Sequence, residues 1–174
     1  MLEEFNLLAT TSRGYESYAR AELLHLMEKI GDPNPSIDRT GISGLIAVKT
    51  SLDPFEAIEK FRCVLHEKPY EFRYTLRLIP VEKIVRTDLT QIEEAVAELG
   101  GRIQESETFR VTVEKRFTAT SSREIIEKAA RKIKRKVNLS KPDKVILIEV
   151  VGGLTGISLI EPKNILSVLK EKLL

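Results

Sequence analysis

The chain has 174 residues, which is enough for one ordinary domain or two small ones with a sizeable core. Hydrophobic residues make up 42% and charged residues 31%, a composition that indicates a soluble globular protein and excludes a disordered one. No apolar run approaches the roughly 20 residues of a membrane-spanning helix, and the acidic start lacks the features of a signal peptide. The single cysteine, Cys63, has no partner for a disulfide and no companions at zinc-ligand spacing. We therefore expect an intracellular, cytoplasmic protein without membrane contact.

The positive charge is concentrated in one part of the chain, although the formal net charge is only +2. Residues 1–109 hold 13 Lys and Arg against 19 Asp and Glu, whereas residues 110–141 hold 11 against 3. Residues 142–174 hold 4 of each. Such a window attracts polyanions locally without making the whole protein basic.

The first part of the sequence predicts five elements in the order β-α-β-β-α. Hydrophobic periodicity and the Gly and Pro punctuation place them as a strand over 5–10, a helix over 15–30, strands over 36–40 and 45–50, and a helix over 54–66. Asp53 is a suitable N-cap for the second helix, with Pro54 at its first position. This order is typical of a ferredoxin-like domain.

The remaining sequence predicts a second α/β unit. The expected elements are a strand over 72–79, a helix over 88–99, a strand over 108–113, a helix over 121–137, strands over 144–151 and 154–160, and a C-terminal helix from Asn164. Gly152 and Gly153 form a strong hairpin signal between the last two strands. We place the boundary between residues 66 and 72, which gives domains of residues 1–68 and 69–174, both of mixed α/β (α+β) class.

The expected helix over 121–137 carries most of the positive charge. Ser121 and Glu124 have capping-box spacing at its start. Its apolar stripe consists of Ile126, Ala129, Ala130, Ile133 and Val137. No acidic residue occurs between Lys128 and Pro142, and at about 100° per residue Lys128, Arg131, Lys132 and Arg135 point away from the stripe. The pattern therefore predicts a ridge of positive charge on the solvent side.

Such a ridge favours nucleic-acid binding, because an anionic partner relieves the repulsion between closely spaced cations. The candidate RNA-binding residues are Lys115, Arg116, Arg123, Lys128, Arg131, Lys132, Arg135 and Lys136. The alternative is that these side chains only solvate a helix face and stabilise its C-terminus. Arg73 and Arg77 form a second candidate set on one face of the strand over 72–79, although pairing with Glu71 or Glu82 is the simpler interpretation.

Several motifs resemble those of a THUMP domain. They are F-R-V-T-V-E-K-R at 109–116, S-R-E-I-I at 122–126, V-N-L-S-K-P-D at 137–143, V-I-L-I-E-V at 145–150 and G-I-S at 156–158. The start, T-S-R-G-Y-E at 11–16, resembles the ferredoxin-like domain that commonly precedes a THUMP domain. R-L-I-P-V at 77–81, followed by a helix, resembles the THUMP proteins that act as tRNA acetylation adaptors.

This resemblance implies a function in tRNA modification. THUMP domains occur in thiouridine synthases, methyltransferases, pseudouridine synthases and deaminases, where they grip the tRNA while a separate domain performs the chemistry. The sequence ends at Leu174, where we would expect such a domain to begin, so the resemblance implies a stand-alone, non-catalytic adaptor. Its implied partners are tRNA and a tRNA acetyltransferase that makes N4-acetylcytidine. Only Lys115, Arg116 and the cations of the helix match positions at which the family tends to be basic.

The sequence contains no recognisable active site and predicts no cofactor or metal. Cys63 and His66 could lie on one helix face, but a buried cysteine beside an incidental histidine is the simpler expectation. Gly152 and Gly153 lie in a hairpin and not before a helix, so they do not predict a phosphate-binding loop. Two alternatives to the adaptor stay open: a detached recognition subunit of a tRNA thiolation or methylation enzyme, and an α/β protein-interaction module. The sequence makes no prediction about oligomeric state.

Overall fold

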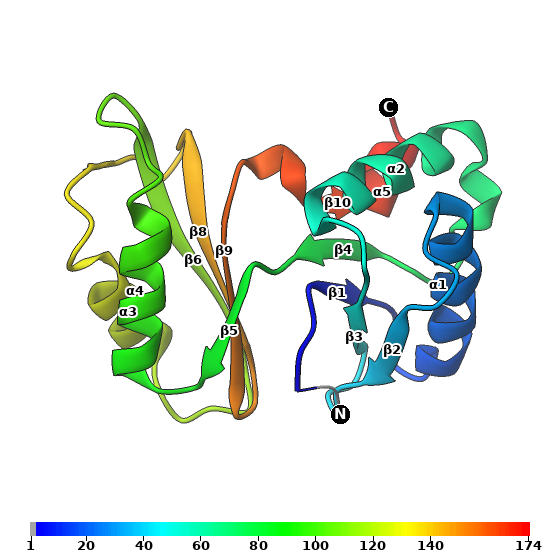
Figure 1. Ribbon diagram of the computed structural model, residues 1–174, viewed down its shortest axis with the longest axis horizontal. Coiled ribbons are helices and arrows are strands. Elements are labelled where there is room, and N and C mark those ends of the chain that lie inside the picture. The colour runs from blue at the N-terminus through cyan, green and yellow to red at the C-terminus, as the bar shows by residue number, and fades with distance from the viewer. Residues whose placement is uncertain (1–2) are drawn as a thin grey trace. The chain divides into compact units, whose positions relative to one another are not determined.

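The computed structural model describes residues 3–174, and the chain divides into two compact units (Figure 1). Unit 1 consists of the chain up to Val81 together with Lys163–Leu174, and unit 2 consists of Glu82–Pro162. Each unit contains one five-stranded sheet with helices, which confirms the expected mixed α/β class. Within the described residues, no helix is both long and apolar enough to span a bilayer.

Unit 1 has the ferredoxin-like order of elements, extended at its C-terminus. The elements are β1 (Leu7–Thr10), α1 (Glu16–Ile30), β2 (Ser36–Arg39), β3 (Leu45–Lys49), α2 (Pro54–Glu67), η1 (Pro69–Glu71), β4 (Arg77–Pro80), β10 (Leu166–Ser167) and α5 (Val168–Lys172). The strands are antiparallel in the order β10-β4-β1-β3-β2. This is the predicted β-α-β-β-α order, completed by β4 to the full ferredoxin-like arrangement and with β10 added beside β4.

Local sequence signals account for the helices of unit 1. The Asp53 carboxylate accepts hydrogen bonds from the backbone N–H groups of Phe55 and Glu56 and so caps α2, as expected. Gly31, which has a φ of 110°, ends α1 in a left-handed conformation that other residues rarely adopt. Leu23 and Met27 of α1 and Phe61 of α2 are fully buried in one core with the sheet.

Unit 2 covers one face of its sheet with two helices (Figure 1). Its elements are β5 (Lys83–Arg86), α3 (Leu89–Gly100), β6 (Thr108–Arg116), α4 (Ser122–Ala130), β7 (Lys136–Val137), β8 (Lys144–Val151) and β9 (Leu154–Ile160), followed by η2 (Pro162–Asn164). The strand order is β5-β9-β8-β6-β7, in which β6 is parallel to both of its neighbours. Ile92 and Val96 of α3 pack with Ile125 and Ala129 of α4 over Ile148 of β8.

The two units divide the chain differently from the predicted domains of residues 1–68 and 69–174. The strand expected over 72–79 begins only at Arg77, and it pairs with β1, so residues 69–81 belong to unit 1. The helix expected from Asn164 is also shorter, because residues 166–167 first pair with β4 and α5 begins at Val168. Both differences arise from strand pairing between distant residues, which a local pattern does not contain.

Candidate nucleic-acid interface

The basic helix begins where the sequence predicts. The Ser121 hydroxyl accepts a hydrogen bond from the Glu124 N–H at 3.1 Å, and the Glu124 carboxylate accepts one from the Ser121 N–H at 3.3 Å. These two bonds form the expected capping box. The buried residues of the helix are Ile125 and Ala129, so the apolar stripe is centred on Ile125 and not on Ile126.

The predicted extension of this helix to Val137 is wrong, because α4 ends at Ala130. Ile133 turns back onto α3 at Gly100, where a Cβ atom would come within 2.9 Å of Ile133 Cγ1. Only a residue without a side chain permits this approach. Lys132, Arg135 and Lys136 therefore follow the helix in the chain and are not part of it.

Residues 131–141, which we call the basic segment, follow α4 and add a two-residue strand to the edge of the sheet next to β6. Lys136 and Val137 form β7 beside Thr108 and Phe109. The Arg110 guanidinium donates to the Leu139 carbonyl at 2.9 Å and holds the segment beyond β7. The segment thus consists of turns around a two-residue edge strand and does not form a helical ridge.

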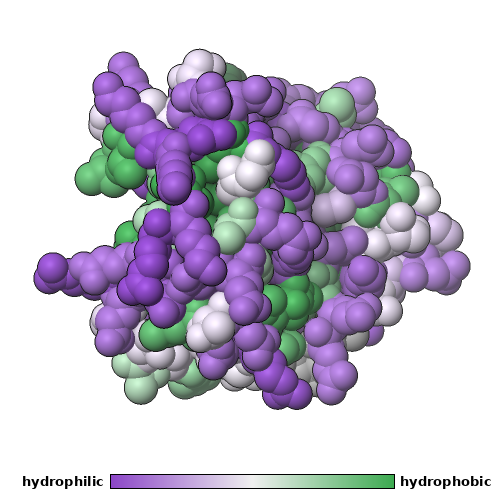
Figure 2. Space-filling view, turned by 60° about the vertical axis from the view of Figure 1, so that its left-hand side comes forward, coloured by the Kyte–Doolittle hydropathy of each residue, from purple (hydrophilic) through white to green (hydrophobic). Residues whose placement is uncertain are grey.

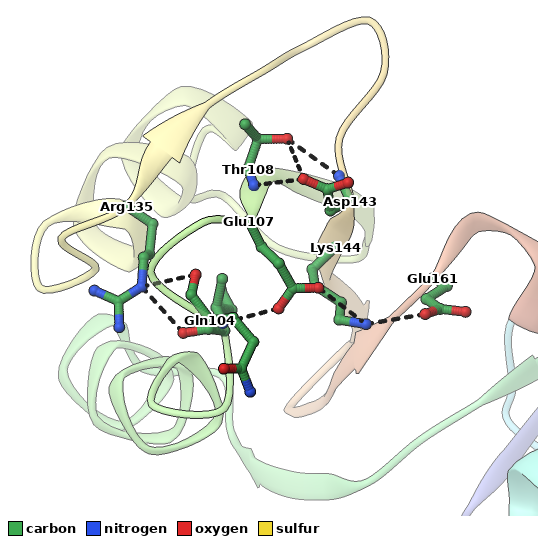
Figure 3. A network of polar contacts seen from close by, with 8 residues as sticks. Gln104, Glu107, Thr108, Arg135, Asp143, Lys144 and Glu161 are labelled. Atoms are coloured by element: carbon green, nitrogen blue, oxygen red, sulfur yellow. Dashed lines mark hydrogen bonds and ion pairs between the residues drawn. The ribbon is translucent and has the colours of Figure 1, made fainter.

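A network of polar contacts anchors both ends of the basic segment (Figure 3). Arg135 Nε donates to the carbonyl oxygens of Ile103 at 3.0 Å and Gln104 at 3.1 Å. The Thr108 N–H donates to Asp143 Oδ2 at 2.8 Å, and this bond together with the Thr108 hydroxyl lowers the pKa of the Asp143 carboxyl. Arg135, a predicted RNA-binding residue, therefore joins the loop after α3 to the basic segment.

Two more predicted cations share one carboxylate. Glu93 of α3 is buried, and its carboxylate oxygens lie 3.2 Å from Lys128 Nζ and 3.5 Å from Lys132 Nζ. Burial raises the pKa of the Glu93 carboxyl, but the hydrogen bonds and charges of the two lysines outweigh it and bring the pKa below its ordinary value of 4.5. A carboxylate from the acidic N-terminal part of the sequence thus neutralises two of the cations that were expected to form the positive ridge.

The remaining predicted cations before the basic segment also have partners. Arg116 Nη1 lies 2.7 Å from the Glu149 carboxylate, which is 1% exposed, so this pair is buried in the sheet. Arg123 pairs with Glu127 one helical turn away at 2.9 Å, but its side chain is 87% exposed and is accessible to a ligand. Lys115 is exposed and donates only to the Thr120 carbonyl, at 3.3 Å.

Four basic residues of the basic segment are exposed and form no ion pair within residues 3–174. We call them the open cations: Arg131, Lys134, Lys136 and Lys141. Two of them, Lys134 and Lys141, are absent from the candidate RNA-binding residues predicted from the sequence. Both lie in the run of cations without acidic residues between Lys128 and Pro142, which is the sequence feature that indicates them. The structure thus concentrates unneutralised charge on the extended segment after α4.

Apolar side chains accompany the open cations. Leu139 is 72% exposed, and Val137, which the sequence places in the core, is half-exposed. Phe117 is also exposed but lies at the other end of β6 from β7, with a φ of 55° that is uncommon for a bulky residue. Figure 2 shows one face of the molecule on which hydrophilic side chains predominate and small hydrophobic patches lie between them.

Two other predicted residues belong to unit 1. Arg77 is half-buried on β4, and Arg73 is exposed in the segment before it. The expected pairing partners bind other cations, since Glu71 contacts His25 and Lys29 and Glu82 contacts Arg102. Cys63 is exposed and not buried as expected, and the His66 imidazole lies 2.9 Å from the Glu171 carboxylate. Within residues 3–174, no group of three or more acidic, histidine or cysteine side chains could hold a metal ion.

Several solved structures share this fold. They include PH1313 from Pyrococcus horikoshii Ot3 (21% identity over 89% of this chain and 54% of that chain, TM-score 0.67) and TrmN from Thermus thermophilus (16%, 88% and 44%, 0.55). A third is a 4-thiouridine synthetase in complex with RNA and with bound ATP (16%, 91% and 42%, 0.51). The present chain spans about half the length of these proteins. At such low identity, the likeness concerns the fold alone.

The sequence of unit 2 also matches a known family. None of the curated protein sequences matches the chain, but residues 86–160 match the family model of the THUMP domain. The match begins at the last residue of β5 and finishes at the end of β9, so it covers the open cations and the whole of β6, β7, β8 and β9. Residues 86–160 are therefore similar to a THUMP domain.

Proposed function

We propose that the chain binds tRNA through the basic segment of its THUMP domain. The observation that carries this proposal is the set of open cations, which stand on an extended segment without carboxylate partners. Lysine and arginine in this state neutralise phosphates and release condensed counterions when RNA binds. A folded RNA would then be selected by its A-form shape and by its 2′-hydroxyl groups.

The choice of tRNA as the RNA rests on the THUMP domain and on the solved structures of similar fold. Two of these are a 4-thiouridine synthetase in complex with RNA and the protein TrmN. The resemblance in residues 77–81 supports a more specific role, in which this chain presents tRNA to an acetyltransferase that makes N4-acetylcytidine. In this role the chain supplies no catalysis of its own and acts in the cytoplasm.

The first experiment reverses two open cations. We expect Arg131→Glu with Lys134→Glu to weaken tRNA binding roughly a hundredfold, because each change removes a phosphate contact and adds repulsion. The matched control is Lys49→Glu with Lys170→Glu, which makes the same charge change at two exposed lysines of unit 1. Filter binding or fluorescence anisotropy measures both affinities. Equal loss in the two variants would mean that only the net charge matters, and would refute the site.

A second experiment tests the adaptor role. Deletion of the gene should remove N4-acetylcytidine from total tRNA, measured by mass spectrometry of the nucleosides. The open-cation variant should fail to restore this nucleoside, whereas the charge-matched control should restore it. Loss of a thiolated or methylated nucleoside instead would identify the chain as a recognition subunit of that enzyme class. An unchanged nucleoside profile would contradict both roles.

A further inference from the structure

Three of the four tyrosines of the chain form a cluster on the surface of unit 1. Tyr18 and Tyr74 are stacked, with ring centroids 5.2 Å apart and an interplanar angle of 22°. Tyr15 is stacked on Tyr74 at 5.7 Å and is tilted against Tyr18 at 5.9 Å. Tyr15 is 47% and Tyr18 57% exposed, so much of the ring surface faces solvent.

The surrounding backbone holds the cluster in place. Tyr15 is the N-cap residue of α1 and Tyr18 lies in its first turn. Tyr74 lies in the segment before β4, where the Glu22 carboxylate accepts hydrogen bonds from the N–H groups of residues 73, 74 and 75 at 2.6–3.1 Å. This carboxylate fixes an otherwise irregular segment against α1. The rings are therefore held in position before any ligand arrives.

Two arginines adjoin the tyrosines in the sequence. Arg13 lies two residues before Tyr15, and Arg73 directly precedes Tyr74. Both residues are exposed, and neither guanidinium has an ion pair or a side-chain hydrogen bond within residues 3–174. The acids nearest in sequence are engaged, since Glu16 accepts from the Gly44 N–H at 2.8 Å and Glu22 holds the Tyr74 segment. Exposed aromatic rings with exposed arginines next to them in the sequence suit a ligand with both flat rings and phosphates.

We propose that this tyrosine cluster binds unpaired nucleobases of a single-stranded RNA segment, with Arg13 and Arg73 contacting the adjacent phosphates. The proposal rests on tRNA binding by the chain, and it adds a second, chemically different site for the same ligand. Stacking on tyrosine tolerates any base, because every base presents a π face. An aliphatic partner surface would not need the two guanidinium groups, and a duplex would not offer open base faces.

The test uses the full chain and a short oligoadenylate as the single-stranded probe. We expect Tyr18→Leu to weaken oligoadenylate binding about tenfold, while Tyr18→Phe, which keeps the ring, retains wild-type affinity. Tyr70→Leu is the matched control, because Tyr70 is the fourth tyrosine and is exposed outside the cluster. An abasic oligonucleotide with the same phosphates should bind weakly and equally to wild type and Tyr18→Leu.

Tyrosine fluorescence gives a second readout that reports the rings themselves. The chain contains no tryptophan, so its emission comes from the four tyrosines. Oligoadenylate should quench this emission, and the quenching should decrease in Tyr18→Leu and in a second variant, Tyr15→Leu. If Tyr18→Leu retains wild-type affinity and quenching in a correctly folded protein, the tyrosine site does not exist. Wild-type affinity in the leucine variants would lead to the same conclusion, because a leucine side chain has no π face on which a base can stack.

A blunt RNA hairpin without unpaired ends separates this proposal from the proposed function. Reversal of Arg131 and Lys134 should abolish hairpin binding, whereas Tyr18→Leu should leave it unchanged. If hairpin binding is lost on reversal of the open cations but oligoadenylate binding is unchanged in Tyr18→Leu, the proposal of tRNA binding is supported and the tyrosine site is refuted. If oligoadenylate binding is weakened by Tyr18→Leu but hairpin binding is unchanged by reversal of the cations, the tyrosine site is supported. The basic segment is then refuted as the duplex site.

Discussion

The cations of unit 2 fall into two groups that look alike in the sequence. Those on α4 and the end of β6 are partnered, since Arg116 pairs with a buried carboxylate and Lys128 shares Glu93 with Lys132. Those on the basic segment are mostly open, because only Lys132 reaches an acid of α3, whereas Arg131, Lys134, Lys136 and Lys141 form no ion pair within residues 3–174. A count of basic residues therefore overestimates the binding surface, and the position of each acid in the fold decides which charges reach solvent.

The largest effect that separates the two groups is one of stability. Arg116→Met should reduce the free energy of unfolding by about 3–5 kcal/mol, because it leaves the buried Glu149 carboxylate without this counter-charge. Arg123→Met removes an equivalent but exposed pair with Glu127, and its unfolding midpoint should hardly move. Urea denaturation measures both. If Arg116→Met instead unfolds like wild type and binds RNA poorly, Arg116 belongs with the open cations.

The next effect distinguishes two adjacent residues, Lys134 and Arg135. Arg135→Met should cost about 1–3 kcal/mol of stability, because the carbonyls of Ile103 and Gln104 lose a charged donor. Lys134→Met should leave stability unchanged and weaken tRNA binding. Thermal melts of the two variants should show the loss of stability in Arg135→Met, and fluorescence anisotropy should show the loss of tRNA affinity in Lys134→Met. A stable Arg135→Met protein would show that the network of Figure 3 does not anchor the segment.

The basic segment also shows what the sequence could and could not predict. The capping box at Ser121 and the hairpin at Gly152 were correct because each is a local signal of neighbouring residues. The end of α4 was missed because no Gly or Pro marks it. Contacts between distant residues, such as Ile133 against Gly100, stop the helix there. The pairing of Glu93 with Lys128 was invisible for the same reason, since packing of α3 against α4 creates it.

A third, smaller effect concerns salt. Lys136→Gln should lower the slope of log affinity against log salt concentration by roughly one, as expected for one lost phosphate contact. Lys128→Gln should change the slope much less, because Glu93 already neutralises that ammonium. Titrations of tRNA at a series of salt concentrations compare the two. Equal changes in slope would show that Lys128 exchanges Glu93 for a phosphate when RNA binds.

The smallest expected effect is a gain. Glu93→Gln removes the carboxylate that holds Lys128 and Lys132, so both lysines join the open cations and tRNA binding should tighten severalfold.

The same substitution should destabilise the fold at neutral pH. Because the pKa of Glu93 is lowered on folding, its contribution is present above 4.5 and is lost as the pH falls through the lower folded value. The stability difference between wild type and Glu93→Gln, measured by urea denaturation, should therefore shrink in acid. A variant that loses stability but binds tRNA no more tightly would mean that Glu93 positions α4 without masking the RNA site.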